Sequence, residues 1–303
     1  MKKIRIAVVG YGNIGKSAAE AVLAAQDMEL AGIIRRNGAN DQVPQTLPGT
    51  KFIDEEQDIS VLGHVDAALL CKPTRMIEEY AKKYLSLGIH TVDSFDIHNA
   101  IVDLQKNLMD SAVKNKAVAI ISAGWDPGSD SVVRALLEAA APMGLTYTNF
   151  GPGMSMGHSV VARSKPGVAD ALSITIPLGT GIHRRMLYLQ IEDNADLEKV
   201  SEEIKNDDYF RHDELHIIPV SDISALMDKG HGVHMVRKGC SSGRDNQLFT
   251  FEMRINNPAL TAQVMVSCAR ACTRQHPGVY TMVEIPPIDL LPGERDDIIN
   301  RLV

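Results

Sequence analysis

The amino-acid sequence predicts an α/β protein, in which a Rossmann-type parallel sheet precedes an α+β domain with a mainly antiparallel sheet. Three observations carry this prediction. Short apolar strand segments alternate with amphipathic helical segments over the first 122 residues, which is typical of a parallel sheet covered on both faces. A glycine-rich turn joins the first strand to the first helix. After residue 145 the strand segments lengthen and alternate polar with apolar residues, which indicates an antiparallel sheet with one solvent-exposed face.

The hydrophobic pattern gives each element in order. In the first domain, residues 1–124, we expect strands at 3–9, 29–34, 67–71, 90–92 and 117–122 and helices at 14–25, 76–87 and 101–114. In the second, residues 125–279, we expect helices at 129–141, 197–205 and 260–274 and strands at 171–176, 186–191, 215–220, 234–238 and 248–255. The last two of these helices should cover the antiparallel sheet. Residues from about 280 to 303 contain a short helix expected to pack back on the first domain.

Composition excludes several classes of protein. The 303 residues are 45% apolar and 23% charged, with a net charge of −7, 5% aromatic residues and no long basic run, which argues against a nucleic-acid partner. No apolar run is long enough to span a membrane, and the N-terminal apolar run is too short for a signal peptide, so a cytoplasmic location is expected. Cys268 and Cys272 stand four apart on an expected helix, a spacing that could hold a metal, but we expect them to be reduced, buried thiols. The four cysteines form no CxxC motif, so no metal site is expected.

The glycine-rich turn has the spacing GxGxxG and lies directly between an expected strand and an expected helix. It predicts a dinucleotide site, since the first glycine permits a tight turn, the second lets backbone approach the pyrophosphate, and the third lets the helix pack on the strand. A glycine-rich turn without a ligand is the alternative. The expected cofactor contacts here are Gly10, Tyr11, Gly12, Asn13, Ile14 and Gly15.

The end of the second strand indicates which nucleotide is bound. NAD sites carry an acid there to accept from the ribose hydroxyls, whereas this chain has Arg35 and Arg36. Two guanidinium groups suit the 2′-phosphate of NADP. Solvated arginines that begin a loop are the alternative.

Two further segments follow strands of the parallel sheet. Ligands of open α/β sheets lie beyond the carboxyl ends of the strands, so both segments are expected to line the cofactor site, although either could be an ordinary turn. The expected contacts are Cys71, Lys72, Pro73, Thr74, Asp93, Ser94 and Phe95.

Six segments are rich in glycine and polar groups and poor in core residues, and we expect them to be loops. Ordering such loops is costly unless they bind something. They contain acids, arginines, histidines and an amide but no evident nucleophile system, a mixture that suits an amino-acid ligand. The segments are 93–98, 122–128, 149–158, 183–185, 230–232 and 256–258.

The motifs VVGYGNIGKS, VDSFDIH, ISAGWDPGSDS, TYTNFGPGMSMGHS, MDKGHGV and MRINNPALTAQV extend over essentially the whole chain. With them the sequence closely resembles the meso-diaminopimelate dehydrogenase family, in its shorter bacterial form. The resemblance implies reversible, NADP-dependent oxidative deamination of meso-2,6-diaminopimelate at its D-centre. The product, L-2-amino-6-oxopimelate, cyclises to tetrahydrodipicolinate, and the reverse reaction serves lysine and diaminopimelate biosynthesis.

The resemblance also implies roles for individual residues. Asp96 and Asp126 would hold the reacting amino group. Residues shaping the pocket would be Trp125, Phe150, Met156 and Gly157, and those binding the distal L-centre would be Thr175, Arg185, His231 and Asn257. For Trp125, a core position is the alternative.

The resemblance leaves other points open. An aspartate or water would deprotonate the substrate ammonium, and His158 is either a base or a structural loop histidine. The chain is shorter than longer family members around residues 178–183, which would widen the pocket toward other D-amino acids.

Other functions are weighed against this one. One alternative is another two-domain NADP oxidoreductase, such as a D-amino acid dehydrogenase or a protein like dihydrodipicolinate reductase or homoserine dehydrogenase. A non-catalytic NADP sensor is the alternative from a different class. The apolar β-face of the second domain is expected to form a homodimer or a higher homo-oligomer.

Overall fold

The computed structural model describes residues 3–38, 43–227 and 230–303. The chain divides into two compact units. The first unit comprises Met1–Ala135 and Pro258–Val303, and the second comprises Leu136–Asn257. The chain therefore returns to the first unit at residue 258, earlier than the position near 280 expected from the sequence.

A seven-stranded sheet forms the centre of the first unit, with strand order β14-β6-β5-β4-β1-β2-β3. All its recorded strand pairs are parallel, which confirms the predicted Rossmann-type sheet. Its strands are β1 (Ile4–Val9), β2 (Met28–Arg35), β3 (Phe52–Asp54), β4 (Ala67–Leu70), β5 (His90–Asp93), β6 (Val118–Ile120) and β14 (Gly278–Tyr280).

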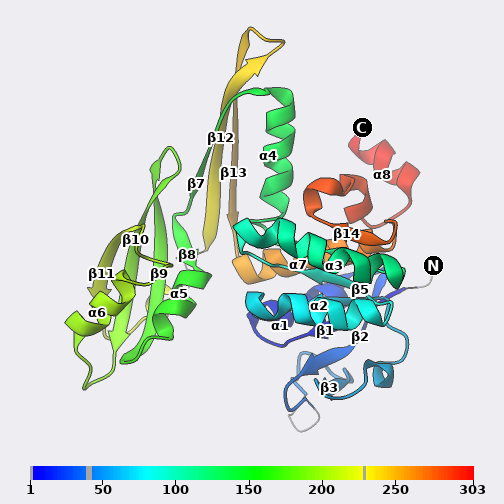
Figure 1. Ribbon diagram of the computed structural model, residues 1–303, viewed down its shortest axis with the longest axis horizontal. Helices are drawn as coiled ribbons and strands as arrows, with labels where there is room; N and C mark the ends of the chain where they lie inside the picture. Colours follow the sequence, from blue (N-terminus) through cyan, green and yellow to red (C-terminus); the bar gives the residue numbers. More distant parts are fainter. Residues whose placement is uncertain (1–2, 39–42, 228–229) are drawn as a thin grey trace. The chain divides into compact units, whose positions relative to one another are not determined.

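Helices cover both faces of this sheet (Figure 1), because alternate residues of its strands are apolar on both sides. Ile6 and Val8 of β1 belong to a core with α1 (Asn13–Ala24) and α7 (Asn257–Cys272). Ala7 and Val9 belong to a second core, with α2 (Ile77–Ser86) and α3 (Ile101–Lys114). The helix α8 (Arg295–Leu302) ends the chain within this unit.

The second unit contains two sheets rather than the one expected. A four-stranded sheet has the order β11-β10-β9-β8, and a three-stranded sheet has the order β13-β12-β7. Every recorded pair is antiparallel except β10 with β11. The strands are β7 (Met143–Phe150), β8 (Gly153–Ser155), β9 (Val168–Gly179), β10 (Ile182–Ile191), β11 (Glu214–Pro219), β12 (His231–Ser241) and β13 (Asp245–Ile255).

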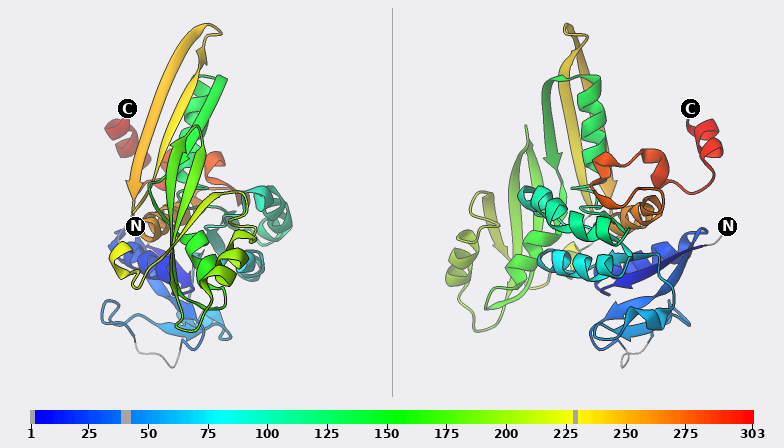
Figure 2. Two further views of the ribbon diagram at one scale, coloured as in Figure 1. Left: turned by 90° about the vertical axis from the view of Figure 1, so that its left-hand side faces the viewer. Right: turned by 45° about the vertical axis from the view of Figure 1, so that its right-hand side comes forward.

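Figure 2 shows β12 and β13 as a long hairpin. Two helices of the second unit, α5 (Met156–Arg163) and α6 (Leu197–Lys205), pack on the four-stranded sheet and share an apolar core with β9 and β10. The helix α4 (Ser129–Ala140) crosses the division between the units. Short 3-10 helices lie at Ile59–Leu62, Thr74–Met76, His98–Ala100, Ser224–Leu226, Met282–Glu284 and Pro287–Leu290.

Two expectations drawn from the sequence are wrong. The helix expected at 260–274 does not cover the antiparallel sheet, because α7 is buried in the first unit's core. Of the six segments expected to be loops, 149–158, 183–185 and 230–232 lie largely in β7, β8, α5, β10 and β12. Their glycines allow strands to approach closely: a Cβ on Gly153 would lie 2.0 Å from the carbonyl oxygen of Gly230.

Across residues 3–38, 43–227 and 230–303, no helix is both long and apolar enough to cross a membrane. In the same residues no group of three or more histidine, cysteine or acidic side chains could hold a metal ion. Asp228 and Lys229, which form part of the motif MDKGHGV, lie outside the described residues.

Candidate active site

The turn between β1 and α1 has the backbone that a dinucleotide loop requires. Gly10 has φ +100°, a conformation that L-residues with a side chain rarely adopt. A Cβ on Gly15 would lie 2.1 Å from the carbonyl oxygen of Gly10, whereas a Cβ on Gly12 would meet nothing within 4 Å. The first and third glycines are therefore required by the fold, and the second faces open space into which a ligand fits.

The N-terminus of α1 is free to receive an anion. Gly12 is its N-cap, no side chain caps the helix, and its first turn contains no acidic residue. The exposed N–H groups and the positive end of the helix dipole attract phosphate. This arrangement fits the pyrophosphate of a nicotinamide nucleotide.

The two arginines at the end of β2 have different surroundings. The guanidinium of Arg35 lies 4.5 Å from the ring centroid of Phe52 and 5.4 Å from that of Tyr11, and these two rings are in edge contact. Stacking on aromatic rings fixes the plane of that guanidinium. The side chain of Arg36 is exposed, so it is available to a ligand phosphate.

In the segment after β4, one side chain forms an ion pair within the fold and another contacts a predicted site residue. Lys72 is buried and forms an ion pair with Glu55, and its ammonium lies 4.8 Å from the ring of Tyr80. Thr74 donates a hydrogen bond to Asp96, with 2.5 Å between Oγ1 and Oδ1. The two segments predicted at the carboxyl ends of neighbouring strands therefore meet, while the charge of Lys72 is already neutralised.

Asp93 ends β5 and is fully buried. Its Oδ1 accepts hydrogen bonds from the backbone N–H of Phe95 at 2.9 Å and of Ser122 at 3.0 Å. Burial raises the pKa of this carboxyl to about 6, although the two hydrogen bonds oppose the rise. Asp93 therefore ties the ends of β5 and β6 together, and a contact with the cofactor stays a prediction.

Trp125 and Asp126 lie just before α4, and the predicted acid has two partners that the sequence analysis missed. Nη2 of Arg134 lies 3.2 Å from Oδ1 of Asp126 and 2.7 Å from Oδ2 of Asp130. Asp130 is fully buried, and its pKa is raised by burial and by repulsion from Asp126. The signal that could have revealed the partners is the helical spacing of Asp130 and Arg134, four residues apart.

In the second unit, two predicted substrate residues stand side by side. Thr175 of β9 and Arg185 of β10 are cross-strand neighbours, and Nη1 of Arg185 donates a hydrogen bond to the Thr175 hydroxyl. Nε of Arg185 donates to Oδ2 of Asp213 at 2.6 Å. Asp213, just before β11, is a further residue that the sequence analysis missed.

The other predicted substrate residues of this unit have separate surroundings. The ring of Phe150 lies 5.5 Å from that of His183. Met156 and Gly157 begin α5, and Asn257 is the first residue of α7. Buried His231 accepts a hydrogen bond at Nδ1 from the N–H of Gly232 at 2.7 Å. It also lines a cavity of about 430 Å³ with the apolar residues Ile174, Ile176 and Ile255.

His158, considered as a base or a loop histidine, lies on α5. Its Nδ1 lies 2.9 Å from Oγ of Ser155 and its Nε2 lies 3.4 Å from Oδ2 of Asp213. The rings of Tyr209 and Phe210 make edge contacts with it at 5.5 and 5.1 Å. These contacts give it a structural role.

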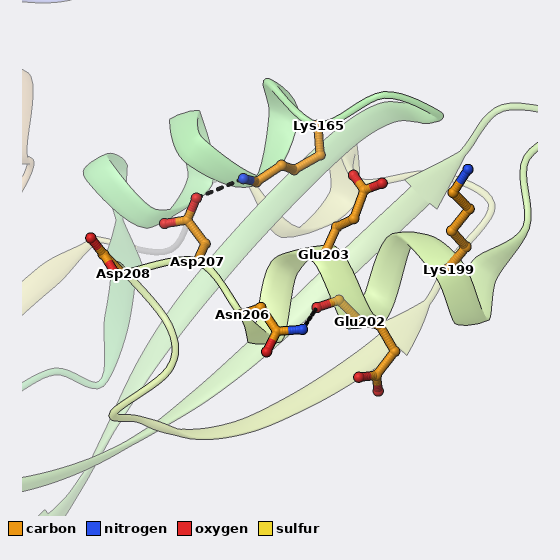
Figure 3. A pocket seen from close by; sticks show the side chains of 7 residues that line it. All are labelled: Lys165, Lys199, Glu202, Glu203, Asn206, Asp207 and Asp208. Carbon is orange, nitrogen blue, oxygen red and sulfur yellow. Dashed lines mark hydrogen bonds and ion pairs between the residues drawn. The ribbon is translucent and has the colours of Figure 1, made fainter.

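A surface hollow in the second unit contains none of the predicted site residues. Figure 3 shows it around α6, with Nζ of Lys165 donating to Asp207 at 2.6 Å. Its remaining lining residues are charged or amide side chains, namely Lys199, Glu202, Glu203, Asn206 and Asp208. Its charges are therefore largely paired within the protein surface.

Comparison with protein families agrees with both units. Residues 4–93 match a model described as an oxidoreductase family with an NAD-binding Rossmann fold. Residues 124–184 match the diaminopimelic acid dehydrogenase C-terminal domain.

Similar proteins extend this agreement to the whole chain. The chain is 57% identical to a meso-diaminopimelate D-dehydrogenase of Bacteroides fragilis over all of both chains. It is 32% identical to the enzyme of that name from Acetivibrio thermocellus, covering all of this chain and 98% of the relative. Among solved structures, Corynebacterium glutamicum DAP dehydrogenase in complex with DAP superposes with a TM-score of 0.87 at 29% identity, covering all of both chains. An engineered D-amino acid dehydrogenase bound to NADP+ gives 0.83 at 29% identity, again over both chains in full.

Proposed function

The chain belongs to the meso-diaminopimelate D-dehydrogenase family, and from that premise we propose that it oxidises meso-2,6-diaminopimelate at the D-centre. The products are L-2-amino-6-oxopimelate and ammonia, and the reaction is reversible. The observation that carries the proposal is the full-length identity of 57% to a relative of that name. The site residues support it, because Arg185 of β10 is held by Thr175 and Asp126 is paired with Arg134.

We assign the reacting end of the substrate to Asp96 and Asp126. Two carboxylates suit an ammonium group, and each is oriented by a partner, Thr74 for Asp96 and Arg134 for Asp126. Bound NADP+ supplies the hydride acceptor. Loss of hydride from Cα and of protons from nitrogen leaves the substrate imine, which water hydrolyses to the 2-oxo group and ammonia. We also assign Trp125, which is buried, to the pocket around the reacting end.

We assign the distal L-centre to Thr175, Arg185, His231 and Asn257, with the carboxylate bound chiefly by Arg185 and His231. A guanidinium binds a carboxylate in a planar, directional way. Gripping the far end fixes which face of the near Cα meets the nicotinamide, and this determines the stereochemistry. Phe150, Met156 and Gly157 line the remaining wall.

The nicotinamide-nucleotide class follows from the Rossmann family match, and we infer NADP in particular. The support is the pair Arg35 and Arg36 at the end of β2, where an NAD site carries an acid. Exposed Arg36 is available for the 2′-phosphate, while Arg35 is oriented by Phe52 and Tyr11. We also place the protein in the cytoplasm, where its cofactor and a free amino-acid substrate occur together.

A homodimer is the assembly we propose, through the face of the three-stranded sheet that carries two exposed leucines. Leu145 of β7 and Leu248 of β13 both pair with Lys238 of β12, so all three lie on one face, with the lysine between the leucines. The leucines are 63% and 66% exposed, which is typical of a surface that a partner covers. Leu248→Lys should shift the purified protein toward monomer in light scattering; an unchanged mass would place the interface elsewhere.

Absorbance at 340 nm tests the proposed reaction directly. Purified protein with NADP+ should reduce the nucleotide with meso-diaminopimelate and not with the L,L isomer, and D,D-diaminopimelate should react poorly because its distal centre is inverted. Reduction by simple D-amino acids at rates equal to the meso isomer would assign a general D-amino acid dehydrogenase. Tight NADP+ binding without reduction by any of these compounds would assign a nucleotide sensor.

A further inference from the structure

Asp213 forms an ion pair with Arg185, the arginine that we assign to the distal carboxylate of the substrate. Its Oδ2 accepts from Nε of Arg185 at 2.6 Å and lies 3.4 Å from Nε2 of His158. The exposed fractions of the three side chains are 22%, 15% and 16%. Burial opposes ionisation of Asp213, but hydrogen bonds from His158 and Arg185 outweigh it and lower its pKa.

The histidine behind Asp213 is itself fixed. Nδ1 of His158 is 2.9 Å from Oγ of Ser155, and the edge contacts of its ring with Tyr209 and Phe210 hold its plane. Carboxylates that are hydrogen-bonded from behind keep one orientation toward the group they face. Asp213 is thus held between a histidine and an arginine.

These contacts determine which donors of Arg185 remain for a ligand. Nε is taken by Asp213 and one N–H of Nη1 by Thr175, while within the described residues Nη2 has no recorded acceptor. The outer edge thus keeps the N–H donors of Nη2 for a ligand, and guanidinium N–H groups of this kind bind the oxygens of a carboxylate.

We propose that Asp213, held by His158, is a positioning residue that orients Arg185 so that its outer edge receives the distal carboxylate of the substrate. The inference rests on the proposed function, because it takes the ligand of Arg185 to be that carboxylate. An arginine without a partner at Nε samples several rotamers, and ordering it on binding costs affinity. Asp213 removes that cost beforehand.

The chain offers a matched control. Glu214 accepts from Nε of Arg184 at 2.6 Å, the same kind of bond at the same distance. Arg184 and Glu214 are cross-strand partners on the opposite face of β10 and β11, since successive strand residues alternate faces. Glu214→Gln therefore removes an ion pair of the same length, although a more exposed one, next to but outside the proposed site.

Steady-state kinetics on the purified enzyme tests the proposal with Asp213→Asn, Asp213→Ala, Glu214→Gln and Arg185→Met. Asp213→Asn should raise KM for meso-diaminopimelate about tenfold, and Asp213→Ala by more, with kcat within about threefold and KM for NADP+ unchanged. Glu214→Gln should match the wild type, and melting temperatures measured on all four variants separate positioning from unfolding.

Different results overturn different claims. If KM stays unchanged or falls in both Asp213 variants while Arg185→Met raises it, Asp213 only competes for the charge of Arg185 and the inference is wrong. If Arg185→Met itself leaves KM unchanged, the assignment of the distal carboxylate in the proposed function fails first. An equal rise in KM in Glu214→Gln would show a general electrostatic effect and would also refute the inference.

Discussion

Two glycines of the nucleotide loop should respond in opposite ways to the same substitution. A Cβ on Gly15 would lie 2.1 Å from the carbonyl oxygen of Gly10 and 3.5 Å from the Cβ of Cys71. A Cβ on Gly12 would meet nothing within 4 Å, and the φ of Gly12 is −80°, which alanine adopts without strain. Gly15→Ala should therefore damage the fold, whereas Gly12→Ala should damage only the binding of the nucleotide.

The contact distances set the size of each effect. To accept a methyl at position 15, α1 must move away from β1 by more than 1 Å, and overpacking of this kind costs about 1–3 kcal/mol. At roughly 2–4 °C per kcal/mol, the melting temperature of Gly15→Ala should fall by several degrees. At position 12 the methyl would displace a phosphate from the backbone N–H groups, and losing one such charged hydrogen bond costs about 1.5–3 kcal/mol. KM for NADP+ should then rise about ten- to a hundredfold.

Thermal unfolding without nucleotide and the KM for NADP+ measure the two effects separately. The melting temperature of Gly12→Ala should lie within a degree or two of the wild-type value. Alanine is a poorer N-cap residue than glycine, but it also lowers the conformational entropy of the unfolded chain, and the two effects offset each other. Gly15→Ala should unfold earlier. If Gly12→Ala leaves KM for NADP+ unchanged, the nucleotide does not approach this turn; if Gly15→Ala keeps the wild-type melting temperature, the close packing of α1 on β1 is refuted.

Three further variants test the charges of the first unit. Replacing Arg35 and Arg36 together with alanine should raise KM for NADP+ tenfold or more while changing KM for NAD+ little; equal changes for both nucleotides would refute the 2′-phosphate assignment. Arg270→Met removes the two bonds from Arg270 to Asp27, of 2.5 and 2.9 Å, and a third to the carbonyl oxygen of Leu290 at 2.9 Å, and should cost about 2–3 kcal/mol. The hydrogen bond from Arg270 lowers the pKa of Asp27, so this stabilisation is present above pH 4 and is lost as pH falls through the lowered pKa; an acid profile identical to that of the variant would contradict it. Burial raises the pKa of Asp93 to about 6, so folding takes up a proton between pH 4 and 6. The free energy of unfolding of the wild type therefore falls as pH rises through that window, by up to about 3 kcal/mol at neutral pH. Asp93→Asn should flatten this slope in urea unfolding, and an unchanged slope would show that Asp93 ionises normally.

Much of the first unit could be predicted from the sequence, because its signals are local. The strand before Gly10 and the helix after Gly12 are continuous patterns, and the order of strands and helices up to β6 agrees with them except for the short strand β3, which was not predicted. The hydrophobic pattern predicts the helix α7 but not the sheet on which it packs. This helix is buried on most sides, so its sequence contains no polar stripe that would indicate which surface it covers.

The glycine-rich segment at 149–158 misled for a different physical reason. Glycine and proline in this segment predict a loop, but the glycines serve strands that run very close together. Gly153 of β8 is such a glycine, since a Cβ on it would lie 2.0 Å from the carbonyl oxygen of Gly230. Local sequence cannot distinguish a glycine needed for a turn from one needed for a close neighbour, because the neighbour lies in another strand.

The partners of the predicted charged residues also lie outside the predicted segments, so the patterns in those segments do not reveal them. Sequence analysis selected Arg185, Lys72 and Asp126, and each is paired with an opposite charge that it did not select, namely Asp213, Glu55 and Arg134. The partner of Arg185 follows from strand register alone: Arg185 pairs with Leu215, so Asp213, two residues earlier, lies on the same face. That register is set by the fold and not by any pattern near Arg185. A buried charge without such a partner would be costly, so a charged motif in a half-buried site implies a second residue of opposite charge. Finding that residue, rather than the motif, is the information that the structure adds.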